Sequence, residues 1–405
     1  MKILVLTSIY PALDVKIANN TNVVHYFAYE WVKEGHEVIV VHNYPVYMRI
    51  FHWIARFAAK MICSKFNTAV TAVYQNKPVE FNLDGVKVIR LPLYKPFPHF
   101  AVPSKVMNRQ IEEIGIWCKK YKFIPDIITA HNFYPHIPMV NRLKADYFPN
   151  ARTCIVVHKQ AWKMLRFCGA DYKTEIEKID VFGYRSLPLK REWERYTETS
   201  PNSFMCYSGV PVCFLNRKDL CVIKKPISRI IYVGSFIRRK FPEKILIAIK
   251  NSSLGNNFTL DYVGDGINRK IIEKLIAENH WEKQVTLHGF VQRNQIPLLM
   301  ARANLFIMIS EEETFGLVYL EAMSMGCIVI ASRDEGMEGI IIDGVNGFLC
   351  KAGDEKELAI IIDKINMMSQ EELNIISDKA RATAIRLTDC NVAKKYIENI
   401  ISRTC

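Results

Sequence analysis

Long apolar runs are missing from this chain of 405 residues, since none approaches the roughly 20 residues that a membrane-spanning helix needs. The first stretch, residues 1–7, is short and is followed by Pro11 and polar residues, without the small-residue cleavage site of a secretory signal. The 11 cysteines form no Cys-x-x-Cys pair, which speaks against a zinc site and against a disulfide framework. We therefore expect a cytoplasmic protein in a reducing compartment.

Internal repeats, low-complexity tracts and nucleic-acid-binding motifs are also absent from the sequence. Half of the residues are hydrophobic and 23% are charged, as in globular proteins with two or three well-packed domains. The net charge of +13 is uneven. Residues 1–213 carry 28 Lys and Arg against 17 Asp and Glu, whereas residues 214–405 carry 26 against 24. The charge of the first half predicts an anionic partner, and an anionic membrane, a phosphorylated substrate and nucleic acid all remain possible from charge alone.

The most informative stretch, residues 305–331, predicts a strand, a tight turn at Gly316, a helix and a second buried strand. Glu313 lies in the turn and Glu321 lies in the helix. A helix that begins at Gly316 offers free N–H groups to an anion, and carboxylates accept hydrogen bonds from hydroxyl groups. Open α/β sheets bind ligands at the carboxyl ends of their strands, so this unit predicts a site for phosphate and sugar.

Strand and helix patterns alternate through both halves of the chain, and the alternation restarts at Arg229–Val233. The pattern predicts an α/β protein with two doubly wound, Rossmann-like domains. We expect the first domain over residues 1–212, a linker over 213–227, the second domain over 228–388 and a final helical segment over 389–405.

The segment from Glu313 to Glu321, with seven residues between the two carboxylates, resembles the signature of retaining glycosyltransferase family 4. Asp343-Gly344-Val-Asn-Gly347 is similar to the turn that follows in that family. The resemblance implies the GT-B fold, in which two domains face a central cleft and the last helix returns to the first domain. It also implies a retaining, metal-independent hexosyltransferase without a cofactor, which uses a UDP- or GDP-linked sugar. The expected acceptor is a hydroxyl of a growing lipid-linked surface glycan, as in capsule, exopolysaccharide or lipopolysaccharide.

The same resemblance implies roles for individual residues. The expected donor-binding residues are Arg238, Arg239, Lys240, Gly264, Phe290, Val291, Glu313, Phe315, Gly316, Leu317 and Glu321. Lys240 would neutralise the leaving diphosphate, Glu313 would hold a hydroxyl of the donor sugar and Glu321 would hold the ribose hydroxyls. The expected catalytic residues are Glu313, His131 and Lys240, and the expected acceptor-side residues are His158 and Asn20. Ser235 stands where the family has Arg, and Gly339 stands where it has Glu.

Residues 47–66 predict a helix with a cationic stripe beside an apolar face. The stripe comprises Arg49, His52, Arg56 and Lys60, and the apolar face comprises Ile50, Trp53, Ile54, Phe57 and Met61. A basic amphipathic helix is typical of a membrane-surface element, which places the protein peripherally on the inner face of the plasma membrane. An ordinary surface helix packed on its own sheet is the alternative.

Two other functions fit parts of the sequence. A sugar-nucleotide epimerase shares the implied fold, although the paired glutamates argue against it. A catalytically degenerate homologue that binds anionic glycan is the non-enzymatic alternative, supported by Ser235 and Gly339.

Overall fold

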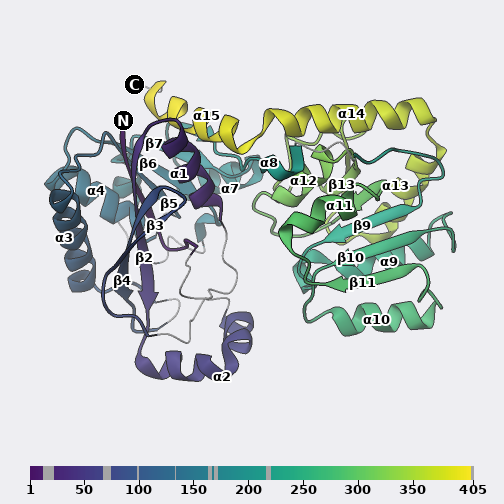
Figure 1. The fold of residues 1–405 in the computed structure, drawn as a ribbon, viewed down its shortest axis with the longest axis horizontal. Coiled ribbons are helices and arrows are strands. Elements are labelled where there is room, and N and C mark those ends of the chain that lie inside the picture. Colours follow the sequence, from purple (N-terminus) through teal and green to yellow (C-terminus); the bar gives the residue numbers. More distant parts are fainter. Residues whose placement is uncertain are drawn as a thin grey trace. The chain divides into compact units, whose positions relative to one another are not determined.

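The computed structural model describes residues 1–11, 22–66, 74–97, 100–132, 134–162, 167, 172–215 and 220–402, with the backbone alone for 58–66. The chain forms two compact units (Figure 1). The first unit comprises Met1–Arg185, Leu189–Cys206 and Val392–Cys405, and the second comprises Ser186–Pro188 and Tyr207–Asn391.

The first unit contains an eight-stranded sheet in the order β3-β4-β2-β1-β5-β6-β7-β8. Its strands are β1 (Lys2–Thr7), β2 (Glu37–Val46), β3 (Val79–Leu83), β4 (Val86–Tyr94), β5 (Ile127–His131), β6 (Arg152–Val157), β7 (Val181–Tyr184) and β8 (Ser203–Met205). Neighbouring strands run parallel, except that β3 pairs antiparallel with β4. The central strands are nearly continuous apolar runs, as expected for a parallel sheet that helices cover on both faces.

Helices pack on both faces of this sheet. The helices of this part of the chain are α1 (Val23–Lys33), α2 (Arg49–Phe66), α3 (Ser104–Lys120), α4 (His136–Asp146), α6 (Tyr172–Glu177), α7 (Leu187–Thr197) and α15 (Asp389–Ser402). Alternate strand residues such as Leu4 and Leu6 share a core with α3 and α4. On α15, Tyr396 contacts Phe27 and Trp31 of α1, and the Trp31 indole N–H donates to the Ala393 carbonyl at 2.9 Å. The last helix is thus part of the first unit's packing.

The second unit contains a six-stranded sheet in the order β11-β10-β9-β12-β13-β14, and all of its pairs are parallel. Its strands are β9 (Arg229–Val233), β10 (Thr259–Val263), β11 (Val285–Gly289), β12 (Leu305–Ile307), β13 (Ile328–Ser332) and β14 (Phe348–Cys350). Its helices are α8 (Val212–Leu215), α9 (Pro242–Lys250), α10 (Arg269–Glu278), α11 (Ile296–Met300), α12 (Leu317–Ser324), α13 (Glu355–Met367) and α14 (Gln370–Arg386), with short 3-10 turns at Arg238–Lys240 and Arg293–Gln295. Residues 213–227 contribute Phe214, Cys221, Ile223 and Ile227 to the core of this unit.

The prediction of two parallel α/β sheets is confirmed. The predicted helix over 47–66 forms as α2, but His52 is not part of an exposed cationic stripe. His52 is 2% exposed, and its Nε2 accepts the Tyr47 backbone N–H at 3.1 Å. The side chains of Lys60 and Met61 lie outside the described residues. Across the described ranges, no helix is long and apolar enough to cross a membrane.

Candidate functional site

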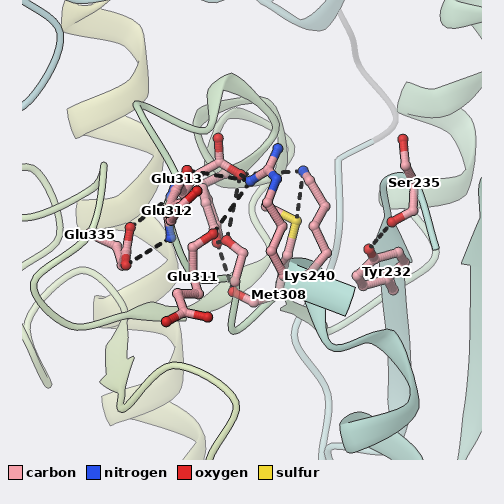
Figure 2. A network of polar contacts seen from close by, with 11 residues as sticks. Tyr232, Ser235, Lys240, Met308, Glu311, Glu312, Glu313 and Glu335 are labelled. Carbon is pink, nitrogen blue, oxygen red and sulfur yellow. Dashed lines mark hydrogen bonds and ion pairs between the residues drawn. The ribbon is translucent and has the colours of Figure 1, made fainter. Parts of the chain in front are cut away.

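The candidate site lies where strands of the second unit end. In a parallel sheet the carboxyl ends of all strands meet at one edge, so the loops after β9, β10, β12 and β13 converge there. The loop after β9 supplies Arg239 and Lys240, the loop after β12 supplies Glu311 to Glu313, and the loop after β13 supplies Glu335. Figure 2 shows Lys240, the three glutamates of the loop after β12 and Glu335 in one polar network.

Lys240 and Glu313 form the centre of this network. The Lys240 ammonium lies 3.3 Å from a Glu313 carboxylate oxygen, and their side chains are 15% and 12% exposed. The same ammonium lies 3.6 Å from the Met308 sulfur at the end of β12. A partly desolvated ion pair of this kind interacts more strongly than a fully hydrated one, because water screens it less. An anion that reached Lys240 would therefore compete with a carboxylate already in place.

Arg239 connects the loop after β9, to which it belongs, with the loop after β12, which carries Glu311 to Glu313 and is called the acidic loop below. Its guanidinium lies 3.8 Å from the Glu313 carboxylate and donates to the carbonyls of Glu311 and Glu312, each at 3.4 Å. The Arg239 carbonyl accepts the Glu311 N–H at 2.7 Å. Arg238 is exposed and, among the described residues, forms no ion pair or side-chain hydrogen bond.

Glu335 holds the acidic loop from the opposite side. Its two carboxylate oxygens accept the backbone N–H groups of Glu312 at 3.0 Å and Glu313 at 2.7 Å (Figure 2). Burial raises the pKa of Glu335, and these two N–H groups oppose that effect. The two carboxylates thus make different contacts: Glu335 accepts backbone N–H groups of the loop, and Glu313 faces the cations.

Gly316 begins α12 in a conformation that glycine favours. Its φ is +82°, and a Cβ there would lie 2.4 Å from the Tyr319 ring. Tyr319 is fully buried and donates its hydroxyl to the Met308 carbonyl at 2.7 Å, which ties the helix start to the end of β12. Phe315 is 4% exposed and stacks on Tyr207, whereas Leu317 is half-buried at the first helical position. The first turn of α12 thereby directs free N–H groups to the strand edge.

Three of the predicted donor-binding residues, Gly264, Phe290 and Val291, lie at the ends of β10 and β11. Gly264 donates its N–H to the Gly289 carbonyl at 2.7 Å, and a Cβ at Gly264 would lie 2.0 Å from the Gly234 carbonyl oxygen. Close backbone packing therefore accounts for this glycine without a ligand. Phe290 is 83% exposed and Val291 is half-buried.

Glu321 lies inside α12 and pairs with Arg293, which follows β11. The Arg293 guanidinium donates to the Glu321 carboxylate, which is 4% exposed. Burial raises the pKa of Glu321 and the neighbouring guanidinium lowers it. A buried carboxylate with one cationic partner keeps acceptor capacity for further donors.

The two predicted histidines lie together in the first unit. His131, at the end of β5, is 1% exposed, and its Nδ1 lies 2.9 Å from Nε2 of His158, which follows β6. The His131 Nε2 lies 3.5 Å from the Tyr396 hydroxyl, which also contacts the Thr129 hydroxyl at 2.6 Å. Burial, with the nearby Arg185 guanidinium, lowers the pKa of His131 to about 3. Burial and His131 also lower the pKa of His158 well below its usual value.

Comparison with known families identifies the second unit. Residues 222–383 match the family model described as glycosyl transferases group 1. The chain therefore carries a group 1 glycosyltransferase domain. The resemblance noted in the sequence is confirmed at this level, and membership of family 4 stays a prediction.

Three proteins illustrate what this chain is similar to. N-acetyl-alpha-D-glucosaminyl L-malate synthase from Bacillus anthracis is 28% identical over 205 residues, which cover 49% of this chain and 53% of that protein. HepE from Anabaena, solved in complex with UDP, has a TM-score of 0.64 at 16% identity, covering 99% of this chain and all of that one. The apo form of the lipopolysaccharide outer core galactosyltransferase WaaB has a TM-score of 0.69 at 15% identity, covering both chains fully. Such structural likeness at low identity shows the GT-B fold.

The group 1 domain thus brings together Lys240, Arg239 and Glu313, as expected from the sequence. Glu321 instead forms an ion pair with Arg293, and Arg238 takes part in neither of these groups of ion pairs. His131 and His158 belong to the other unit, and Asn20 lies outside the described residues. Sequence reasoning missed Glu335 and Arg293, although both follow the carboxyl end of a strand, which is the signal that would have found them.

Proposed function

We propose that the protein is a retaining glycosyltransferase that takes a sugar from a nucleotide diphosphate donor. The observation that carries this proposal is the Lys240–Glu313 pair at the strand edge, beside the helix that begins at Gly316. Cations and free N–H groups suit a diphosphate, and a carboxylate suits the hydroxyls of a sugar. HepE, a structural neighbour that binds UDP, supports a nucleotide donor.

In the proposed reaction, the bond between the anomeric carbon and the donor phosphate breaks while an acceptor oxygen bonds to the same carbon. The leaving nucleotide diphosphate gains negative charge, which Lys240 and Arg239 would stabilise. The acceptor's proton passes to the departing phosphate oxygen on the same face of the sugar, so that the configuration is retained and no metal is required. Glu313 would bind a hydroxyl of the donor sugar, and Glu321 the ribose hydroxyls.

The proposed acceptor is a hydroxyl of a lipid-linked glycan at an anionic membrane. Helix α2 supports this proposal, because its apolar side chains face solvent: Ile50 is 58% exposed, Trp53 59% and Phe57 82%. Arg49 and Arg56 lie on the same helix and are also exposed. Exposed apolar patches rimmed by charge mark interaction sites, and a cationic rim suits an anionic leaflet. The similarity to WaaB, a lipopolysaccharide galactosyltransferase, supports a surface glycan.

Nucleotide-sugar screening tests the donor half of this proposal. UDP- and GDP-linked hexoses are incubated with the full chain, with and without EDTA, and binding and slow hydrolysis are measured. We expect one donor to bind and to be hydrolysed with its anomeric configuration retained, and EDTA to have no effect. Complete loss with EDTA that added metal restores would contradict the metal-free mechanism.

The same screen separates the alternatives. Interconversion of two sugar nucleotides without hydrolysis or transfer would identify an epimerase. A chain that binds glycan but no nucleotide sugar would be a degenerate homologue.

A further inference from the structure

A cavity of about 400 Å³ lies in the first unit, beside the last residues of β2 and β4. Its walls are largely apolar, and the apolar lining includes Val46 at the end of β2, Leu91, Pro92 and Tyr94 of β4, and Val106 on α3. Tyr74 also lines it. This volume falls in the range of small-molecule sites, which are concave, mostly apolar and supplied with a few polar groups.

Two cations line this cavity. Lys105 and Arg109 lie four residues apart on α3, so they project from the same face of that helix. Both side chains are exposed, and among the described residues neither forms an ion pair or a side-chain hydrogen bond. Glu113 follows one turn later, which leaves this row with one excess positive charge. The cations are therefore available to an anionic group whose remainder occupies the apolar walls.

The cavity adjoins α2. Its wall residue Tyr74 packs against two residues of α2, with the Arg49 guanidinium 5.2 Å and the His52 ring 5.4 Å from the Tyr74 ring. A second exposed aromatic segment continues the apolar face of this helix: Phe97 is 41% exposed and lies 5.8 Å from the Phe51 ring of α2. Phe100, 59% exposed, lies 5.5 Å from Phe97. An apolar surface thus leads to an apolar cavity with a cationic lining.

We propose that this cavity binds the phosphorylated head of the lipid that carries the acceptor glycan. The phosphate would lie against Lys105 and Arg109, since both side chains are strong phosphate donors, and the hydrocarbon next to it would lie on Val46, Leu91 and Val106. The site is too small for a whole lipid tail, so the tail would continue along the exposed face of α2. This inference rests on the proposed lipid-linked acceptor and names the part of that acceptor which the chain recognises.

Binding of farnesyl phosphate to the full chain tests the inference by calorimetry. We expect farnesyl phosphate to bind at least 10-fold more tightly than farnesol, inorganic phosphate or dihexanoyl phosphatidylglycerol. The double variant Lys105→Ala/Arg109→Ala should lose at least 10-fold in affinity for farnesyl phosphate and nothing for farnesol. Lys119→Ala, on the same helix but outside the cavity, is the matched control and should bind as the wild type does.

Equal affinity for farnesyl phosphate and inorganic phosphate would overturn the inference, as would unchanged binding by the double variant. Equal affinity for the phosphatidylglycerol would assign the cavity to membrane phospholipid instead and would also overturn it. Val106→Phe gives a second test, because a larger side chain should block the hydrocarbon and leave inorganic phosphate unaffected. Binding of UDP and of GDP, measured on the same samples, distinguishes the two proposals: persistence of either without farnesyl phosphate binding contradicts only the cavity, whereas the absence of both contradicts the donor site.

Discussion

The two units differ in the polar side chains that lie at the carboxyl ends of their parallel strands. The second unit gathers ions: Lys240 and Arg239 face Glu313, with partial exposure to solvent. In the first unit two neutral histidines pair beside a buried cation: His131 and His158 share a hydrogen bond, and burial, with the nearby Arg185, lowers the pKa of both. The same architecture therefore supports a charged network suited to a charged ligand in one unit and an uncharged, packed pair in the other. Fold alone does not determine which chemistry a strand edge carries.

Removing Lys240 should produce the largest change. Lys240→Ala deletes a charged partner of the proposed diphosphate, and such hydrogen bonds contribute about 1.5–3 kcal/mol. We expect binding of the nucleoside diphosphate to weaken by roughly 10- to 150-fold, while binding of the nucleoside without phosphates stays within about twofold. Isothermal titration of both ligands measures this difference.

Lys250→Ala is the matched control for that experiment, because it removes an exposed cation at the last residue of α9, outside the network. It should bind both ligands nearly as the wild type does. Equal losses for diphosphate and nucleoside in Lys240→Ala would indicate damage to the fold and would remove Lys240 from the site.

Charge on the surface of the first unit gives the next test, since α2 carries exposed cations of that unit, Arg49 and Arg56. Arg49→Glu/Arg56→Glu should reduce sedimentation with anionic vesicles by about 30-fold or more, because each cation near such a leaflet contributes about 1 kcal/mol. Raised salt should release the wild type in the same way. Lys119→Glu/Arg195→Glu makes the same change of net charge away from α2 and should retain most of the binding. Equal losses in the two double variants would mean that α2 is an ordinary surface helix.

The Glu321–Arg293 contact separates ribose binding from diphosphate binding. Glu321→Gln should weaken UDP or GDP by about 10-fold, the lower range for a charged hydrogen-bond partner, and should weaken the nucleoside equally because the lost partner is ribose. Arg293→Ala should have a similar effect, since it leaves Glu321 buried without its cation. Normal nucleoside binding by Glu321→Gln would contradict the ribose assignment.

The sequence predicted the second unit closely and its site only in part. Leu305, Gly316 and Glu321 lie in the predicted strand, turn and helix, because apolar runs and a helix-initiating glycine are local signals. Glu335 and Arg293 were missed because each acts through a partner far along the chain, and only the sheet order brings those partners together. The exposure of His52 was predicted wrongly for a related reason. Helical periodicity places His52 on the cationic stripe, but its imidazole is buried and accepts a hydrogen bond from the Tyr47 backbone N–H.

The pH dependence of stability should show the smallest effect at neutral pH. His131 has a usual pKa of 6.5 that burial lowers to about 3, so the unfolded chain binds its proton first. Its contribution to stability is present above pH 6.5 and is lost as the pH falls toward 3, at about 1.4 kcal/mol per pH unit. His136 and His158 act in the same direction, since burial lowers the pKa of each. His131→Asn should therefore reduce, without abolishing, the loss of unfolding free energy between pH 7.5 and 5.5.

Urea titrations at the two pH values measure this change, and His280→Asn, at an exposed imidazole of the second unit, is the control. An identical pH dependence in His131→Asn and the wild type would mean that folding leaves the pKa of His131 unchanged.

Helix α15 has a consequence for how the protein is made. The last helix supplies Tyr396 and the Ala393 carbonyl to the first unit, after the chain has already formed the whole second unit. During translation, Trp31 and Thr129 of the first unit therefore lack these partners until residues 393–396 have been synthesised. The first unit therefore cannot complete its packing until the second unit and α15 have been synthesised. A premature stop near residue 390 would leave the group 1 domain intact. The first unit would then lack α15, and chaperones and proteases would bind its exposed apolar surface.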